Sequence, residues 1–301
     1  MSKMNSSKRM ENITIFFGGK EGPVLYANTI VVNAASKKII LDPSADSEEV
    51  KRLSAERPFV VNSHYHGDHR RLNYLFDKSE FFAPEPDAPM LSDNKKFIDA
   101  IGVDDKEIGF QWINAIKDMY NITEHHITGT FKDGDYVIDK SYGIYAIGLP
   151  GHTLGHSGFI FKDADIAIIT DIDLTSFGPW YGNETSDIDA FLESIEKVKH
   201  LDVKYVLTSH VNAIYTKEEL IPLLDKFAAH IKSREDKLMN CLHKHPMTLE
   251  DLSKKGIIYP KKWLDNNNFL IFFEKKMLEK HIIRLKAKLL IKEQGAVLSI
   301  L

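Results

Sequence analysis

Short apolar runs separated by turn residues recur through the first 210 residues of the chain. Three of these runs are rich in β-branched and aromatic residues and predict the strands of a meander: 12–17, 24–32 and 38–42. A polar stretch at 47–56 predicts a short helix, and the apolar run Phe59–Asn62 that follows it predicts a buried strand. This order of elements is typical of an α/β layered fold.

Further apolar runs continue the same pattern. They predict strands at 81–84, 136–138, 143–147, 157–161, 166–170 and 205–209. An amphipathic helix is expected from the Ser186–Asp189 cap through Lys199. The segment 87–128 mixes helical stretches with turn residues, so we interpret it as an insertion that shapes or covers a site. His125 and His126 lie in it beside no apolar strand and are expected to be solvated.

The last quarter of the chain has a different character. Its pattern predicts helices at about 220–242, 248–256 and after 266–268, followed by a hairpin within 289–298. Residues 230–301 carry 15 Lys and Arg against 8 Asp and Glu, whereas residues 1–229 carry 24 against 35. We therefore predict a catalytic domain at 1–229 and a basic, helical, winged-helix-like module at 230–301.

Composition narrows the possible classes of protein. With 301 residues and 43% hydrophobic content, the chain can bury a large core. No stretch reaches the roughly 20 apolar residues that span a membrane, and the polar start Met1–Arg9 predicts a short frayed terminus, so we expect a cytoplasmic protein without a membrane partner. Cys241 is the only cysteine, which excludes an intrachain disulfide and a cysteine-rich metal site.

The strand Phe59–Asn62 runs into the densest cluster of potential metal ligands, Asn62-Ser63-His64-Tyr65-His66-Gly67-Asp68-His69. Imidazole nitrogen and carboxylate oxygen are ligands of zinc, iron and manganese. His64 and His66 alternate along an extended backbone, while Asp68 and His69 follow the bend at Gly67 and can face a second point. This spacing suits two metals, although an isolated His-x-His pair is more often a coincidence.

Potential ligands end three later strands as well: His152, Asp171 and His210. Taken singly, each would be an ordinary polar residue at a strand end. Because the pattern recurs four times, convergence at one edge of a sheet is the better interpretation. The aromatic loop 177–184 directly after Asp171 is either a pocket wall or a packed surface loop.

These residues resemble the metallo-β-lactamase superfamily. His64-Tyr65-His66-Gly67-Asp68-His69 matches its His-x-His-x-Asp-His signature, the later ligands fall in the family's order, and the match covers about residues 12–212. The resemblance implies an αββα sandwich. It also implies that His64, His66 and His152 hold one metal, that Asp68, His69 and His210 hold the other, that Asp171 bridges them, and that Asp42 steadies the site.

Details around the ligands indicate the subfamily. Pro150–His156 is similar to the His-Thr-x-Gly-His turn of glyoxalase-II-like thioesterases, and we interpret His156 as structural. The usual glycine before the bridging aspartate is Thr170, and Asp173 follows, which leaves open which carboxylate bridges. Cys241 lies outside the ligand order, unlike the cysteine of many true β-lactamases. His66 stands where diiron flavoproteins have a glutamate.

The resemblance implies a dinuclear hydrolase with two divalent ions, zinc first and iron or manganese as alternatives. A metal-bridging hydroxide would attack a thioester, lactone or similar ester of a small molecule, with Asp68 as ligand and proton acceptor.

Two other activities and a second subunit stay open. One activity is a nuclease that grips phosphates with lysines of the C-terminal module, Lys254, Lys255, Lys261 and Lys262, although such charge runs are usually solvated. The other is an iron-dependent sulfur dioxygenase that uses His64, His66 and Asp171. The module could also pack against a second subunit in a homodimer.

Overall fold

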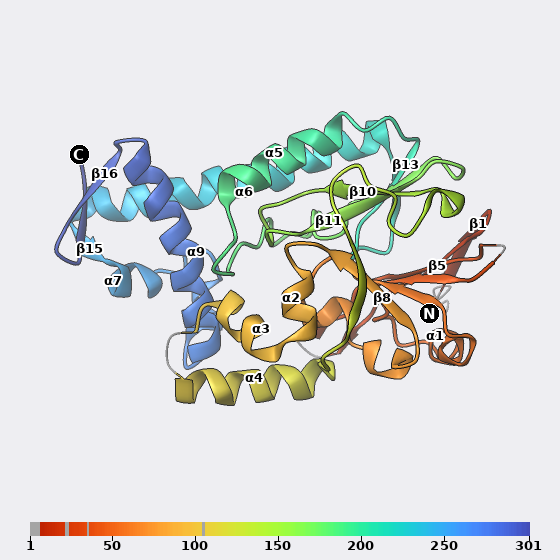
Figure 1. The fold of residues 1–301 in the computed structure, drawn as a ribbon. Helices are drawn as coiled ribbons and strands as arrows, with labels where there is room; N and C mark the ends of the chain where they lie inside the picture. Colours follow the sequence, from red (N-terminus) through yellow and green to blue (C-terminus); the bar gives the residue numbers. More distant parts are fainter. Residues whose placement is uncertain (1–6, 22–23, 35, 104–105) are drawn as a thin grey trace, which may run out of the picture.

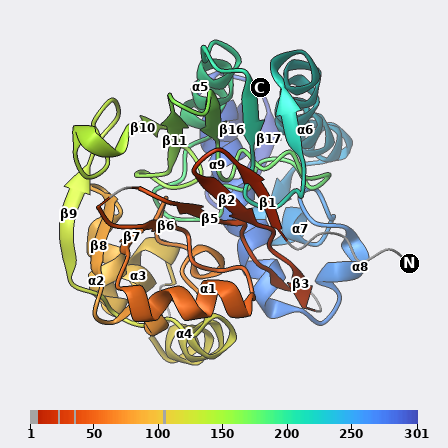
Figure 2. The ribbon, with the colours of Figure 1, turned by 90° about the vertical axis from the view of Figure 1, so that its right-hand side faces the viewer.

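Two β-sheets lie face to face in the computed structural model, which describes residues 7–21, 24–34, 36–103 and 106–301. Helices cover the outer face of each sheet (Figures 1 and 2). In spatial order, the strands of the first sheet are β1 (Ser7–Met10), β2 (Ile13–Phe16), β5 (Thr29–Val32), β6 (Ile39–Leu41), β7 (Phe59–Val61), β8 (Glu80–Pro84) and β9 (Ile127–Phe131). Those of the second sheet are β10 (Ile144–Gly148), β11 (Ser157–Phe161), β12 (Ile166–Ile168), β13 (Tyr205–Leu207) and β14 (Ile214–Thr216).

Parallel pairing brings the polar strand ends together. In the first sheet β6 pairs with β7, and Leu41 lies opposite Val61, so Asp42 comes level with the start of the histidine cluster. In the second sheet β12 and β13 are parallel neighbours, with Ile168 opposite Leu207. Their carboxyl ends therefore lead to Asp171 and His210 at the same edge.

Apolar side chains fill the space between the two sheets, among them Ile13, Val61, Phe159, Ile168 and Leu207. The long helices α5 (Ile188–Lys199) and α6 (Lys217–Lys244) cover the second sheet. The short helix α1 (Glu48–Arg52) packs on the first sheet. This is the four-layer αββα order that was predicted, and burial on both faces explains why most strands are short unbroken apolar runs.

The predicted insertion and the C-terminal segment pack on one another beside the edge that carries the histidines. The insertion contains α2 (Ala88–Ser92), α3 (Asn94–Ile101) and α4 (Lys106–Tyr120). The C-terminal elements are β15 (Met247–Thr248), α7 (Leu249–Ser253), α8 (Lys261–Leu264), α9 (Asn268–Ala287), β16 (Ile291–Gln294) and β17 (Val297–Ile300). Phe97 and Ile101 share one buried cluster with Met277 and Leu278. Figure 1 shows α9 extending between the region of α3 and α4, where it begins, and α6, where it ends.

The predicted domain boundary between residues 229 and 230 falls inside α6, which continues unbroken to Lys244. The two predicted units are therefore linked by one helix and by a shared apolar core. The division of the chain into a catalytic domain at 1–229 and a winged-helix-like module at 230–301 stays a prediction. Among the described residues, no helix combines the length and the apolar character that crossing a membrane requires.

Three local predictions are corrected. The expected strand 24–32 is split into β4 (Val24–Leu25), which pairs with β3 (Lys20–Glu21), and β5, because Ala27 and Asn28 donate their backbone N–H groups to Asp68 and Ser209 instead of to a ladder. Residues 136–138 contribute only one bridge, between Tyr136 and Tyr145. Within the terminus that was expected to fray, Ser7–Arg9 form part of β1, and residues 1–6 lie outside the described part.

Candidate metal centre

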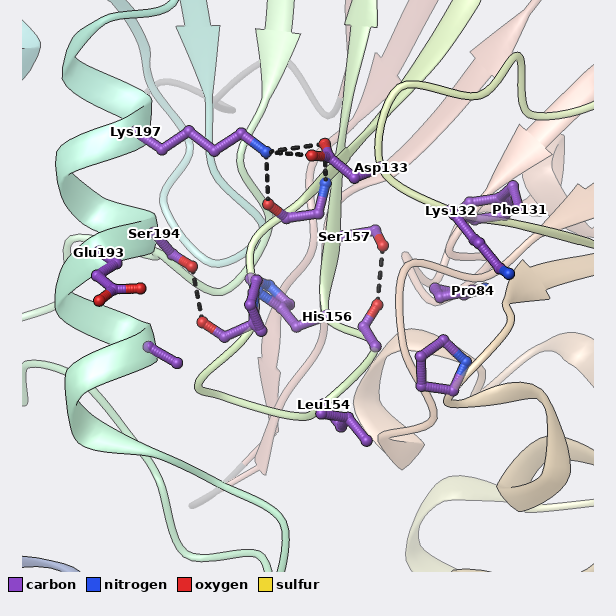
Figure 3. Close-up of a pocket in the computed structure, with 15 residues that line it drawn as sticks. Pro84, Phe131, Lys132, Asp133, Leu154, His156, Ser157, Glu193, Ser194 and Lys197 are labelled. Carbon is purple, nitrogen blue, oxygen red and sulfur yellow. Dashed lines mark hydrogen bonds and ion pairs between the residues drawn. The ribbon is translucent and has the colours of Figure 1, made fainter.

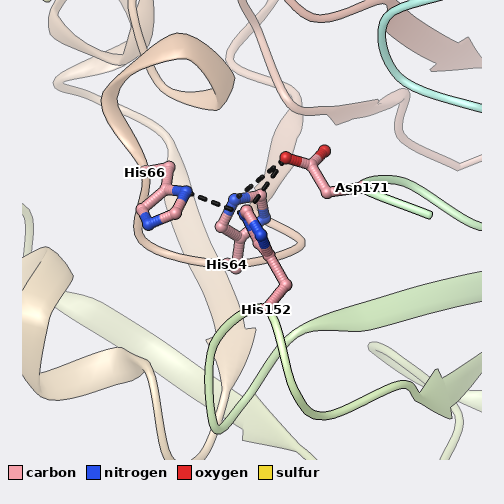
Figure 4. A group of neighbouring side chains, drawn as sticks. All are labelled: His64, His66, His152 and Asp171. Carbon is pink, nitrogen blue, oxygen red and sulfur yellow. Dashed lines mark hydrogen bonds and ion pairs between the residues drawn. The ribbon is translucent and has the colours of Figure 1, made fainter. Parts of the chain in front are cut away.

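The structure brings all seven predicted ligand residues to one edge of the sandwich. They form two groups that share Asp171, and within each group one nitrogen or carboxylate oxygen per residue lies within 4.8 Å of the others. The first group is His64, His66, His152 and Asp171 (Figure 4), and the second is Asp68, His69, Asp171 and His210.

Asp171 lies between the two groups and presents one oxygen to each. Its Oδ2 is 3.1 Å from Nε2 of His152 and 3.9 Å from Nε2 of His64. Its Oδ1 is 2.9 Å from Nε2 of His69 and 3.5 Å from Nε2 of His210. A single buried carboxylate can therefore contact a ligand position in both groups.

Uncharged atoms orient the histidines of the first group. Nδ1 of His152 donates to the backbone oxygen of Trp180 at 2.8 Å, and Nδ1 of His64 lies 3.0 Å from the Ser63 hydroxyl. His66 turns its Nδ1 toward Nε2 of His152, 2.9 Å away, while its Nε2 lies 2.9 Å from the Asn183 side-chain amide. Each ring is held by its other nitrogen, as ligating imidazoles usually are.

Carboxylates surround the second group. Nδ1 of His69 donates to Oδ2 of Asp42 at 2.9 Å, and Asp42 also accepts from the Ser63 backbone N–H and hydroxyl. On the other side, Oδ2 of Asp68 lies 3.3 Å from Nε2 of His210. Asp42 therefore contacts the His69 nitrogen that faces away from Asp171, as the resemblance implied.

The two groups differ in their titration. Burial, reinforced by the neighbouring histidines, lowers the pKa of His64 well below its usual value and lowers that of His66 to about 3. In the second group burial also opposes protonation, but the carboxylates of Asp171 and Asp68 outweigh it and raise the pKa of His210 to about 10. His64 and His66 are thus neutral imidazoles at neutral pH, whereas the second group favours added positive charge.

The donor atoms fit divalent cations. Nε2 of His64 is buried and has no hydrogen-bond partner among the described residues, which is costly unless something else satisfies it. Imidazole nitrogens together with carboxylate oxygens are the ligand set of zinc, iron and manganese sites. His64, His66 and His152 could hold one ion, Asp68, His69 and His210 a second, and Asp171 could contact both.

The turn before Asp171 has a strained backbone. Thr170 has φ +44°, which is unusual for a β-branched residue and agrees with a glycine being usual there. Its hydroxyl is 2.6 Å from Nε2 of His156, and the same nitrogen accepts the backbone N–H of Asp171 at 3.0 Å. His156 lies in neither group, and these contacts agree with the structural role expected for it, because it orients the turn that carries Asp171.

Several other candidates lie outside the two groups. Asp173 accepts the backbone N–H of Thr175, and burial raises its pKa to about 6, so the geometry favours Asp171 as the shared carboxylate. His126 is exposed as expected, whereas His125 is buried and its ring stacks on Phe81. Cys241 lies on α6, in the part of the chain that packs with the C-terminal elements.

A chain of hydrogen bonds links the C-terminal segment to the first group. The buried carboxylate of Glu274, on α9, accepts the backbone N–H groups of residues 257–259. The Tyr259 hydroxyl accepts from Nε1 of Trp180 at 2.8 Å, and the backbone oxygen of Trp180 accepts from His152. Sequence reasoning missed these contacts together with Ser63 and Asn183, although the 177–184 loop was already singled out as a potential pocket wall.

A cavity of about 390 Å³ opens beside both groups, and Asp68, whose side chain is 21% exposed, lines it together with His66, His152, Asp171 and His210. A second cavity, of about 400 Å³, lies behind His156 (Figure 3). There Lys197 is paired with Asp133 and also donates to the Gly148 oxygen, so its charge is already satisfied. The first cavity is therefore the one that gives access to the candidate ligands.

Comparison with solved structures identifies the fold. A metallo-beta-lactamase family protein from Thermus thermophilus superposes with a TM-score of 0.70 at 15% identity, over 97% of this chain and 99% of that one. For a beta-lactamase domain protein from Burkholderia ambifaria the values are 0.68 and 12%, over 98% and 93%. The DIM-1 metallo-beta-lactamase gives 0.53 and 17%, over 74% and 95%. Neither a family model nor a curated protein matches the sequence.

This chain therefore has the metallo-β-lactamase fold, and the predicted αββα sandwich is confirmed. The first two structures are matched over nearly the whole chain, so most of the C-terminal segment has counterparts in them. Only three quarters of the chain finds a counterpart in DIM-1. Most of the C-terminal segment is thus shared with at least two structures of this fold.

Proposed function

We propose that this chain, which has the metallo-β-lactamase fold, is a metal-dependent hydrolase with two divalent ions in its centre. The observation that carries the proposal is the position of Asp171, whose two carboxylate oxygens face two separate groups of histidines. A lone structural histidine cluster would not need a shared, buried carboxylate. Two ions held there would supply a water of lowered pKa and would polarise the bond under attack.

Different residues of this chain would bind the ions and accept the proton from water. The imidazoles of the first group would hold one ion without adding negative charge, and the carboxylates of the second group would balance the charge of the other. Asp68 is more exposed than Asp42 or Asp171, and its pKa is lowered to about 2, so it is ionised at neutral pH. It can therefore orient a water and accept its proton.

The bond that we propose for cleavage belongs to a thioester, a lactone or a similar ester. Support comes from the residues around the centre, because no lysine or arginine lines the cavity among the described residues. The metal ions would pair with the scissile phosphate of a nucleic acid, but its neighbouring phosphates would find no cationic side chain in the described lining. Of the lysines that could grip nucleic acid, Lys254 pairs with Glu250, so we place the nuclease second.

The test is metal analysis of the purified protein, coupled to rates on a small panel of thioester, lactone and phosphodiester substrates. We expect two ions per chain and hydrolysis of at least one carbonyl substrate that chelation abolishes and zinc, manganese or iron restores. Oxygen uptake with a persulfide substrate tests the sulfur dioxygenase alternative in the same preparation. Oxygen uptake without hydrolysis, or phosphodiester cleavage alone, would contradict the proposal.

A further inference from the structure

The cavity beside the metal centre has two chemically different parts. Residues of the two groups, together with Asp173, Thr175 and Asn183, form the polar lining, and apolar side chains from three separate segments make up most of the remainder. The insertion provides Phe97, Ile101, Ile116 and Met119, the loop after Asp171 provides Phe177 and Trp180, and α9 provides Phe269, Leu270 and Phe273. Segments far apart in the sequence have thus converged to build one apolar chamber.

A row of aromatic rings leads from the metal centre outward. The Trp180 ring lies 5.4 Å from the His66 ring and 5.6 Å from the His152 ring. Phe273 follows at 5.3 Å from Trp180, and Phe269 follows at 4.9 Å from Phe273. The wall is therefore continuous from the candidate ligands to the partly exposed Phe269.

Charge is concentrated at the metal end of the chamber. Asp68, Asp171 and Asp173 are the acidic lining residues, and the described lining includes no lysine or arginine. On α9, Lys276 is paired with Glu184 at 3.0 Å, and Lys275 is paired with Glu250. A carboxylate or phosphate on the substrate would enter the chamber without a cationic side chain to pair with, which is costly when it is desolvated.

The chamber also leaves apolar surface uncovered. Met119 on α4 is 45% exposed and Phe269 on α9 is 38% exposed, and both line the chamber from different segments. Contiguous apolar surface of this kind usually marks a binding site. A volume of about 390 Å³ is within the range of small-molecule sites.

Resting on the proposed function, we infer that the substrate carries a neutral, apolar acyl chain, which occupies this chamber while its carbonyl lies at the metal centre. Water adds to the acyl carbon, the C–S or C–O bond breaks, and the thiol or alcohol leaves with a proton, so the products are a carboxylic acid and a thiol or alcohol. The insertion and α9 select the acyl chain, and the histidine edge of the sandwich performs the hydrolysis.

The experiment measures kcat/KM on a series of straight-chain acyl thioesters of N-acetylcysteamine, together with an ω-carboxylated member of equal length. Each added methylene should raise kcat/KM about three- to fourfold until the chamber is full. The carboxylated member should react at least tenfold more slowly than its neutral counterpart. Equal rates along the series, or preference for the carboxylated member, would overturn the inference while leaving the hydrolase intact.

Phe269→Lys places a cation in the chamber at a partly exposed position, so folding should be preserved. We expect it to remove most of the dependence of kcat/KM on chain length. The matched control is Ile283→Lys on the same helix, where the side chain is 66% exposed and lies outside the chamber lining. Equal effects of the two variants would contradict the assignment.

A binding measurement separates failure of the chamber from failure of the hydrolase. Straight-chain methyl ketones are not hydrolysed, and calorimetry should show their Kd falling about three- to fourfold per methylene for the wild type but not for Phe269→Lys. Ketone binding of this kind without hydrolysis of any thioester, lactone or ester would support the chamber and refute the proposed function. Hydrolysis without length-dependent ketone binding would do the opposite.

Discussion

The two groups of the candidate metal centre, its first and second halves, both contain histidines. Different partners orient the histidines in each half. His64 and His152 are held by a hydroxyl and a backbone oxygen, whereas His69 is held by the Asp42 carboxylate. The first half therefore contains no carboxylate apart from Asp171, and the second is rich in negative charge. The short motif at residues 64–69 therefore contributes ligands to two sites of different charge, because the hydrogen-bond partners of its histidines differ.

The largest effect on metal content and on the hydrolysis rate is expected from removing Asp171, which both halves share. Asp171→Ala should abolish binding of both ions and lower hydrolysis about a thousandfold or more, because bound ions supply several kcal/mol to such reactions. Metal analysis and rate measurements check this. The matched control is Asp173→Ala, two residues away and outside both groups, which should keep two ions. Equal losses in the two variants would remove the special position of Asp171.

Removing a ligand from only one half should halve the metal content. We expect His152→Ala and His210→Ala each to retain one ion per chain, because each residue belongs to a different group. Cobalt-substituted protein tests this, since the absorption spectra of the two variants should differ and should sum approximately to that of the wild type. Identical spectra would mean that the halves are not separate sites.

Substituting a residue that hydrogen-bonds to a histidine of one half should weaken metal binding mainly in that half. Asp42→Asn removes the charge that His69 contacts and should weaken the ion of the second half about 10- to 100-fold. Ser63→Ala should weaken the ion of the first half less, because its contact with His64 is uncharged, although Ser63 also donates to Asp42. Competition with a chelator indicator measures both affinities. Equal weakening in both halves by Asp42→Asn would contradict the comparison.

The smallest effect is a pH dependence of stability in the metal-free protein. His66 has a pKa lowered from 6.5 to about 3, so its contribution to stability is lost as pH falls from 6.5 toward 3. His210 has a pKa raised to about 10, so its contribution is present below pH 6.5 and lost as pH rises toward 10. Denaturation of the metal-free protein across this range should therefore show weakening on both sides.

Variants assign the two sides of that profile. His66→Ala should flatten the acidic side, and His210→Ala should flatten the basic side. Because the two groups lie in contact, the separation should be strong rather than complete. If each variant flattened the opposite side, the electrostatic contrast between the halves would be wrong.

Much of this centre could be predicted because its ligands follow apolar strands. The pattern placed His64–His69, His152, Asp171 and His210 at strand ends, and parallel pairing of β12 with β13 then brings two of those ends together. The order of layers followed from the same apolar runs. Burial on both faces of each strand made the runs continuous and easy to locate.

The contacts behind the ligands could not be predicted in the same way. The Trp180 oxygen that orients His152 is a backbone atom, and a side-chain pattern does not show where a carbonyl will point. Glu274 acts through Tyr259 and Trp180 across more than 90 positions of sequence, and only tertiary packing joins them. The split of the expected strand 24–32 has the same origin, because residues 27 and 28 bond to the loops of the centre.

The central claim is that two separate ions occupy the two halves, and its most direct test is the metal stoichiometry of the intact protein. The wild-type chain, stripped with a chelator and titrated with zinc in a calorimeter, should bind two ions per chain with distinct affinities. Asp171→Ala, treated in the same way, should bind none. Binding of one ion per chain by the wild type, or of two by Asp171→Ala, would contradict the account.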